Sequence, residues 1–164
     1  MTSFAVLAAG LAAAVVIDIR IRRIPNWLTA LMTGAGLAMA ATGLSGVTTG
    51  QAFLGFGLGL LLMLPGYALG ATGAGDVKLM AAVGAMVGPA VVFTAFLCTA
   101  VTGGVFALFV AARRGRLMAT LSGTRHLVVS PAEASEVIKE PARANRFAYG
   151  PAIAVGSLLA VLMR

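Results

Sequence analysis

Two aspartates, Asp18 and Asp76, are the residues of this sequence whose type and position could do chemistry. Each stands at one end of an apolar run, and 58 positions separate them. Ionisable side chains near membrane depth are costly and mark function. Two carboxyls held close cannot both ionise readily, so one of them keeps a proton. Such a pair can hydrolyse a peptide bond, because the ionised member takes a proton from water while the protonated member polarises the carbonyl.

Other interpretations stay open when the residues alone are considered. Asp76 can be a helix N-cap, a role that aspartate prefers. Asp18 can pair with Arg22 or lie in the headgroup region. The same two carboxyls can also serve a proton-coupled transporter. The three remaining acids fall in the polar stretch 113–146, where a solvated surface is their ordinary place.

Helix ends predict unequal roles for the two carboxyls. Asp18 follows the first apolar run, at the negative end of a helix dipole, whereas Asp76 precedes a later run, at a positive end. We therefore expect Asp76 to carry the charge and Asp18 the proton.

The elements that must hold these residues are membrane helices. Hydrophobic residues make up 60% of the chain and charged residues 10%, against about 45–50% and 25% in soluble domains. We expect an all-α bundle of about six transmembrane helices, each near the 20 or so residues that span a bilayer. It forms a single domain over 1–164. The expected helices cover 4–17, 27–42, 52–69, two segments within 77–112, and 147–163.

The breaks between these helices are marked unevenly. Pro25 ends the first segment, and Asn26 is expected to cap the second. The long apolar run after Asp76 must turn either at 88–89 or at 102–104, and the residues do not decide between them. A polar loop covers about 113–146 and can hold a short amphipathic helix at 132–140.

Basic residues give the expected bundle an orientation. With six spans, eleven of the twelve lysines and arginines fall on one side of the membrane, and only Arg164 falls on the other. The positive-inside rule places that side in the cytoplasm and both termini outside. Cations lying between apolar runs act as orientation signals, so nucleic acid is not an expected partner, whereas the lipid bilayer is. Trp27 and Tyr149 are expected at the interfaces, as belt aromatics.

Three motifs resemble one family. Residues 73–79, GAGDVKL, are similar to the GxGDxKL motif of type IV prepilin peptidases, which are intramembrane aspartic proteases. The segment Ile24-Pro25-Asn26 after Asp18 resembles the segment that follows the family's first aspartate. Residues 149–154, YGPAIA, resemble the opening of its last helix.

This resemblance implies an aspartic endopeptidase of the bacterial inner membrane. It would cleave the leader of prepilins and pseudopilins at the cytoplasmic face, after a glycine, in pilus biogenesis and secretion. The resemblance makes Asp18 and Asp76 the catalytic pair, without cofactor or metal. Gly73 and Gly75 match the flexible loop, where a missing Cβ permits close backbone approach.

Three further positions, Pro25, Asn26 and Lys78, are expected to position this loop or the substrate. Lys78 can also snorkel to the interface or attract an acidic group. The larger members of the family carry paired CxxC motifs and a methyltransferase activity. Cys98 is the single cysteine here, so the chain resembles the compact peptidases of tight-adherence (Flp-type) pili, with archaeal preflagellin peptidases close by.

Overall fold

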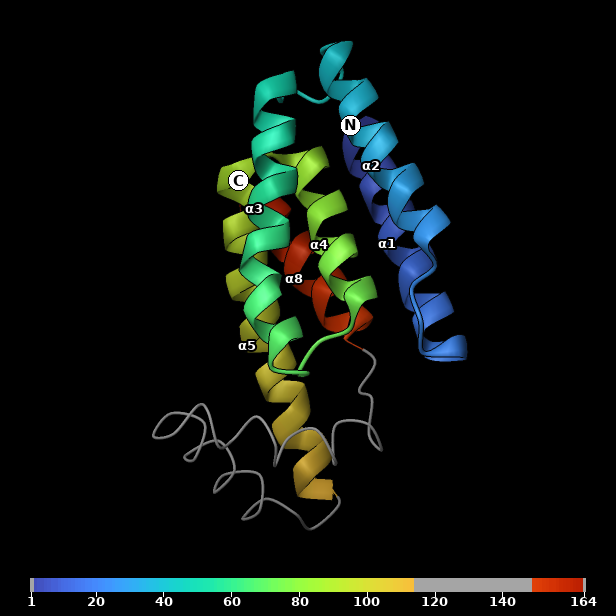
Figure 1. Ribbon diagram of the computed structural model, residues 1–164, viewed down its shortest axis with the longest axis vertical. Helices are drawn as coiled ribbons and strands as arrows, with labels where there is room; N and C mark the ends of the chain where they lie inside the picture. The colour runs from blue at the N-terminus through green and yellow to red at the C-terminus, as the bar shows by residue number, and fades with distance from the viewer. Residues whose placement is uncertain (1, 114–148, 164) are drawn as a thin grey trace.

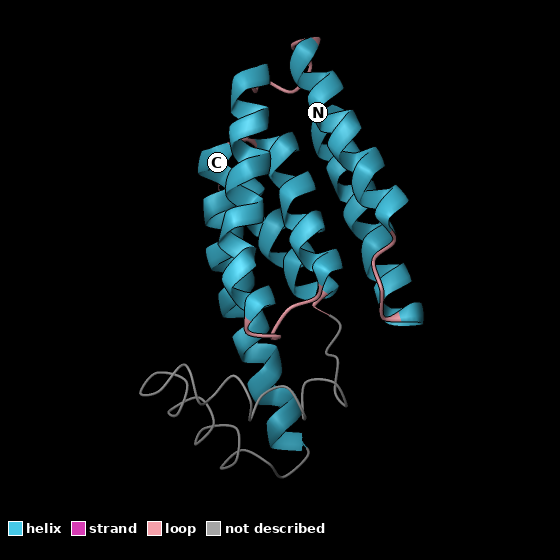
Figure 2. Ribbon diagram, in the orientation of Figure 1, coloured by secondary structure: helices cyan, strands magenta, loops and turns pink. Residues whose placement is uncertain are grey.

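The structure, a computed structural model, describes residues 2–113 and 149–163, and the part it describes is helical throughout (Figure 2). The expected helix at 132–140, and the polar loop beyond Arg113, lie outside the described residues. The helices are α1 (Thr2–Ile21), α2 (Asn26–Ala41), α3 (Thr49–Ala68), α4 (Ala74–Val87), α5 (Pro89–Arg113) and α8 (Gly150–Leu162).

The helices run alternately up and down (Figure 1). The α1–α2 turn, the α3–α4 loop and the first residues of α8 lie together at one end of the bundle, and the two chain termini lie towards the other (Figure 1). The described residues thus form the expected all-helical bundle. By length and composition, three helical segments suffice to cross a membrane: Thr2–Ile21, Thr49–Ala68 and Pro89–Phe106.

Helix α4 is the shortest but one of the described helices and the most enclosed. It contacts all five others, and every residue from Val77 to Met86 is buried except Lys78. Its small residues let the neighbouring backbones approach closely, as membrane helices require. The turn left open by the sequence falls at Gly88, which adopts a φ of +81°, and Pro89 begins α5. Residues 102–104 continue inside α5.

Glycines set the distance between α3 and α4. A Cβ on Gly55 would meet the carbonyl oxygen of Gly84, and a Cβ on Gly84 would meet that of Gly55. One turn along α3, a Cβ on Gly59 would lie 2.6 Å from the carbonyl oxygen of Met80. The two backbones are thus in direct contact along this face, and α3 fixes the height and tilt of α4.

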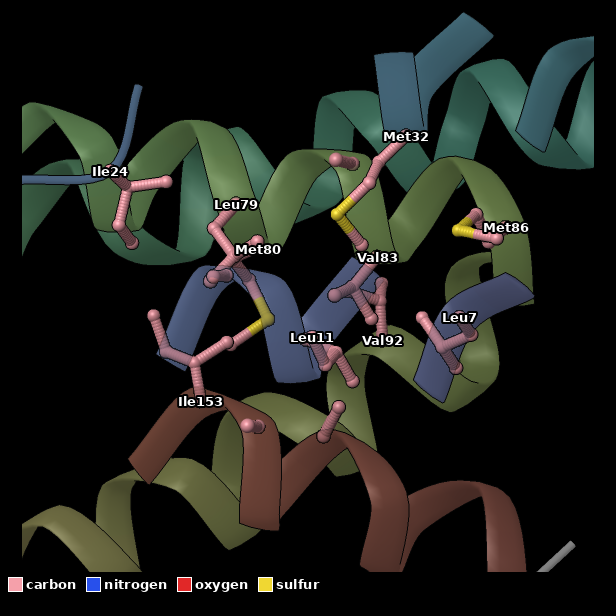
Figure 3. Packing of buried hydrophobic residues seen from close by; sticks show 14 of the residues in the cluster. Leu7, Leu11, Ile24, Met32, Leu79, Met80, Val83, Met86, Val92 and Ile153 are labelled. Carbon is pink, nitrogen blue, oxygen red and sulfur yellow. The ribbon is translucent and has the colours of Figure 1, made fainter. Parts of the chain in front are cut away.

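One cluster of buried hydrophobic side chains joins the helices. The cluster includes Leu7 and Leu11 from α1, Met80 and Val83 from α4, and Ile153 from α8, which lies beside Met80 in the close view (Figure 3). Many small van der Waals contacts of this kind together hold α1, α4 and α8 against one another.

Two boundaries differ from the sequence-based expectation. Helix α1 continues to Ile21, so Asp18 lies inside its last turn rather than after it. Arg22 then closes the helix in the left-handed region, with a φ of +52°, and its amide donates to the carbonyl of Asp18. The prediction that Asn26 caps the second helix is wrong, since the N-cap is Pro25 and Asn26 is the first helical residue. Its amide side chain has another partner, Lys78.

Candidate active site

Asp18 faces the interior of the bundle from the last turn of α1 and is only 5% exposed. Its Oδ2 accepts a hydrogen bond of 2.9 Å from the backbone amide of Gly150, the first residue of α8. A buried carboxylate needs such a donor, because desolvation without one is costly. The burial of Asp18 therefore depends on an element that lies 132 residues away in the sequence.

Asp76 lies in the first turn of α4 and is 8% exposed. Its Oδ2 accepts from the amide of Gly73 at 2.8 Å, and its own amide donates to the carbonyl of Gly73 at 3.0 Å. The first bond is the half of a capping box in which an acid at the third helical position accepts from the N-cap amide. The N-cap residue is glycine and has no side chain, so the return bond runs between the two backbones. Asp76 thus stabilises the start of α4, and it does so from within the helix rather than as the N-cap residue.

The glycines before Asp76 are required for space rather than for backbone angle. Gly73 has an ordinary φ of −86°, and a Cβ there would lie 3.2 Å from Oδ2 of Asp76. A Cβ on Gly75 would lie 3.1 Å from Cβ of Ile24. Because Ile24 stands directly before Pro25, the loop that carries Asp76 packs against the turn that follows Asp18.

A second contact joins the same two segments at the surface. The Nζ of Lys78 donates to Oδ1 of Asn26 at 2.9 Å. Lys78 lies two residues after Asp76 in α4, and Asn26 is the first residue of α2, directly after Pro25. Two positions that were expected to position the loop or the substrate are therefore brought together, and Pro25 supplies the cap between them.

Tyr149 joins this group, although its position in the sequence suggested only an interfacial aromatic. It is half-buried just before α8, and its ring fits the space left by Gly103 of α5. Burial raises the pKa of the Tyr149 phenol, and the negative charge of Asp76 raises that pKa further. The phenol is therefore neutral at physiological pH. The motif 149–154 was the available signal, but it gave no role to this side chain.

The structure removes the ground on which unequal carboxyl roles were predicted. Asp18 does lie in the last turn of α1, where the dipole is negative. It also accepts from the first amide of α8, where the dipole is positive. Asp76 lies at the positive end of α4. Helix dipoles therefore no longer distinguish the two carboxyls.

Comparison with known proteins identifies the family. Residues 5–108 match the type IV leader peptidase family. This match spans more than half of the 164 residues, so the chain belongs to that family, as its three motifs predicted. Searches of curated proteins and of solved structures gave no match. The matched segment contains Asp18 and Asp76 and ends before Tyr149. With its long apolar helices, the chain is a membrane peptidase by family.

Proposed function

We propose that this protein is an intramembrane aspartic endopeptidase that removes the leader peptide of type IV, Flp-type prepilins. The observation that carries the proposal is that the last turn of α1 and the first turn of α4 lie at the same end of the bundle (Figure 1). These turns carry the two buried aspartates, Asp18 and Asp76. The start of α8 interacts with both aspartates. The amide of Gly150 donates to Asp18, and the charge of Asp76 acts on the phenol of Tyr149.

The chemistry needs only these carboxyls and water. One carboxyl is ionised and takes a proton from water as the water oxygen bonds to the scissile carbonyl carbon. The other is protonated and donates to the carbonyl oxygen, which gives a neutral tetrahedral diol. When the C–N bond breaks, the leaving nitrogen takes a proton from the first carboxyl, and the second recovers its own from the diol. Each carboxyl thus ends in its starting state, and no cofactor or metal takes part.

The loop residues support the position of Asp76 in this reaction. Gly73 bonds its carboxylate, and Gly75 lets the loop pack on Ile24. The link between Lys78 and Asn26, next to Pro25, ties the start of α4 to the start of α2. In the proposed enzyme these residues hold the second aspartate towards the first.

Charge gives the orientation that the substrate requires. Arg20, Arg22 and Arg23 are exposed next to the buried Asp18. The positive-inside rule places this end of the bundle at the cytoplasmic face. In the proposed topology all six described helices lie in a bacterial inner membrane with both termini on the far side. The prepilin or pseudopilin would then present its leader from the cytoplasm, with its hydrophobic helix in the lipid.

Co-expression with a pilin precursor tests the proposal. We expect Asp18→Asn and Asp76→Asn each to abolish leader removal at unchanged protein level in the membrane. Thr42→Val, an equally conservative change beyond the far end of α2, should cleave normally because the Thr42 hydroxyl donates to carbonyls of its own helix. Cleavage by either Asn variant would refute the catalytic pair. Intact precursor with wild-type protein, together with proton uptake that depends on both aspartates, would favour a transporter instead.

A further inference from the structure

The first amide of α8 donates its hydrogen bond to the side chain of Asp18. The first amides of a helix lack partners within the helix. Here the second helical residue is Pro151, which has no N–H. The amide of Gly150 donates to Oδ2 of Asp18 at 2.9 Å, in a buried setting. Within the described residues, the amide of Ile153 donates to the carbonyl of Tyr149.

Gly150 also leaves space that any side chain would fill. A Cβ at this position would lie 2.7 Å from Oδ2 of Asp18 and 3.1 Å from its Cβ. Gly150 is helical, and it is not one of the described glycines that adopt a positive φ. The requirement for glycine is therefore one of close approach, and the atom approached is the carboxylate oxygen itself.

This hydrogen bond holds Oδ2 of Asp18, and Oδ1 is the oxygen that the proposed reaction would use. With Oδ2 of Asp18 held by an amide, rotation about the bond to the carboxyl group is restrained, and Oδ1 takes a defined direction. A catalytic group that is held in its reactive geometry before substrate binds saves the entropy of finding it. The neighbouring residue, Tyr149, interacts electrostatically with Asp76. The start of α8 therefore contacts one aspartate and interacts with the charge of the other.

We propose that Gly150 is a positioning residue for leader cleavage, which clamps Asp18 through its backbone amide and its missing Cβ. This inference rests on the proposed function, since it assigns the clamp a role in that reaction. The alternative is that the same hydrogen bond serves only the stability of the fold.

An amide-to-ester change at residue 150 separates these roles, because glycolic acid in place of Gly150 removes the N–H and adds no atom. The matched control is the same change at Gly57, where one backbone bond is lost far from Asp18 and no neighbour lies within 4 Å of a Cβ. The infrared carboxyl band of Asp18, identified by its loss in Asp18→Asn, reports the hydrogen bond. Prepilin cleavage per folded protein reports the reaction.

We expect the Asp18 band to shift in the residue-150 ester but not in the residue-57 ester. Cleavage by the residue-150 ester should fall about tenfold to a hundredfold relative to the control, with KM nearly unchanged, because a buried carboxyl oxygen is left without its donor. Gly150→Ala should lose activity as well, whereas Gly104→Ala, with open space around it, should not.

The two levels of the account fail separately. If Asp18→Asn still cleaves prepilin, the proposed function is wrong. If Asp18→Asn is inactive while the residue-150 ester cleaves as fast as the residue-57 ester, the clamp is wrong and the proposed function stands. An unmoved Asp18 band in the residue-150 ester would also overturn the clamp.

Discussion

Two glycines of α3 offer a matched test of how α4 is placed. Gly59→Ala and Gly57→Ala make the same chemical change two residues apart in one helix. A Cβ at residue 59 would lie 2.6 Å from the carbonyl oxygen of Met80, whereas nothing lies within 4 Å of a Cβ at residue 57. Ordinary contact begins at 3.4 Å, so α4 would have to move by 3.4 less 2.6, about 0.8 Å.

The expected cost follows from comparing the two variants. Replacing glycine by alanine in a helix is favourable by roughly 0.5–1 kcal/mol, and this gain is common to both. It cancels in the difference between them, which leaves the cost of overpacking, about 1–3 kcal/mol. Gly59→Ala should therefore have a free energy of unfolding about 1–3 kcal/mol below that of Gly57→Ala.

The shift of α4 in Gly59→Ala should also lower the rate of cleavage. Met80 lies one helical turn beyond Asp76, so a shift of α4 at residue 80 moves the carboxyl as well. A misplacement of about 1 Å can lower a rate by about a hundredfold. We expect the kcat of Gly59→Ala for prepilin cleavage to fall by roughly ten- to a hundredfold per folded protein, and that of Gly57→Ala to stay near wild type.

Detergent-micelle unfolding gives the stabilities, and cleavage in lipid vesicles gives the rates. Equal stability and equal kcat in the two alanine variants would refute the direct backbone contact between α3 and α4. Lower stability in Gly59→Ala at an unchanged kcat would refute the idea that this contact sets the position of Asp76.

Three smaller predictions concern the same end of the bundle. In Asp76→Asn the pKa of Tyr149 should fall, because a negative charge that raises it is gone; ultraviolet titration above pH 9, with the other tyrosine replaced by phenylalanine, measures the shift, and an unchanged pKa would contradict the charge assigned to Asp76. Lys78→Met and Asn26→Ala should each slow cleavage, and a double-mutant cycle should give a coupling of about 0.2–1 kcal/mol because the bond is exposed; additive effects would show that the bond does not couple them. Arg22→Gly should raise the free energy of unfolding by about 0.5–1 kcal/mol, since glycine accepts its positive φ without strain; a loss of stability would argue against that backbone conformation.

Burial and the charge of Asp76 raise the pKa of Tyr149, and this shift makes the stability of the fold depend on pH. The neutral phenol is favoured in the folded state, so its contribution is fully present below the usual pKa of about 10. The contribution is lost as the pH rises through the higher folded value. Tyr149→Phe should therefore reduce the alkaline loss of stability.

The sequence predicted the helices well where local chemistry decides them. The expected break around Pro25 lies between α1, which ends at Ile21, and α2, whose N-cap is Pro25. The apolar runs correspond to the helices that were found. The turn at Gly88 could not be chosen in advance, because a helix as short as α4 is stable in a bilayer only when other helices enclose it. That enclosure depends on glycine contacts between α3 and α4, which join residues 21 positions apart (Gly59 and Met80) and 29 positions apart (Gly55 and Gly84).

The site shows the same division. Asp18 and Asp76 were singled out by their types, their flanking motifs and their place at helix ends, and both are buried in the structure. Asn26 was wrongly expected to cap α2, because a lysine 52 residues away takes its side chain. The role of Gly150 was missed for a similar reason, since its partner Asp18 is 132 residues away. Pairings at such separations follow from the packed bundle and leave no local pattern.

The measurement that tests the central claim most directly is the rate of prepilin cleavage by purified, reconstituted Asp18→Asn, Asp76→Asn and the double variant. Residues that act as one unit show strongly non-additive losses. We predict that each single variant loses at least about a thousandfold in kcat and that the double variant loses no more than the singles. Cleavage near the wild-type rate in either single variant, or losses that multiply in the double variant, would contradict an aspartate pair acting together.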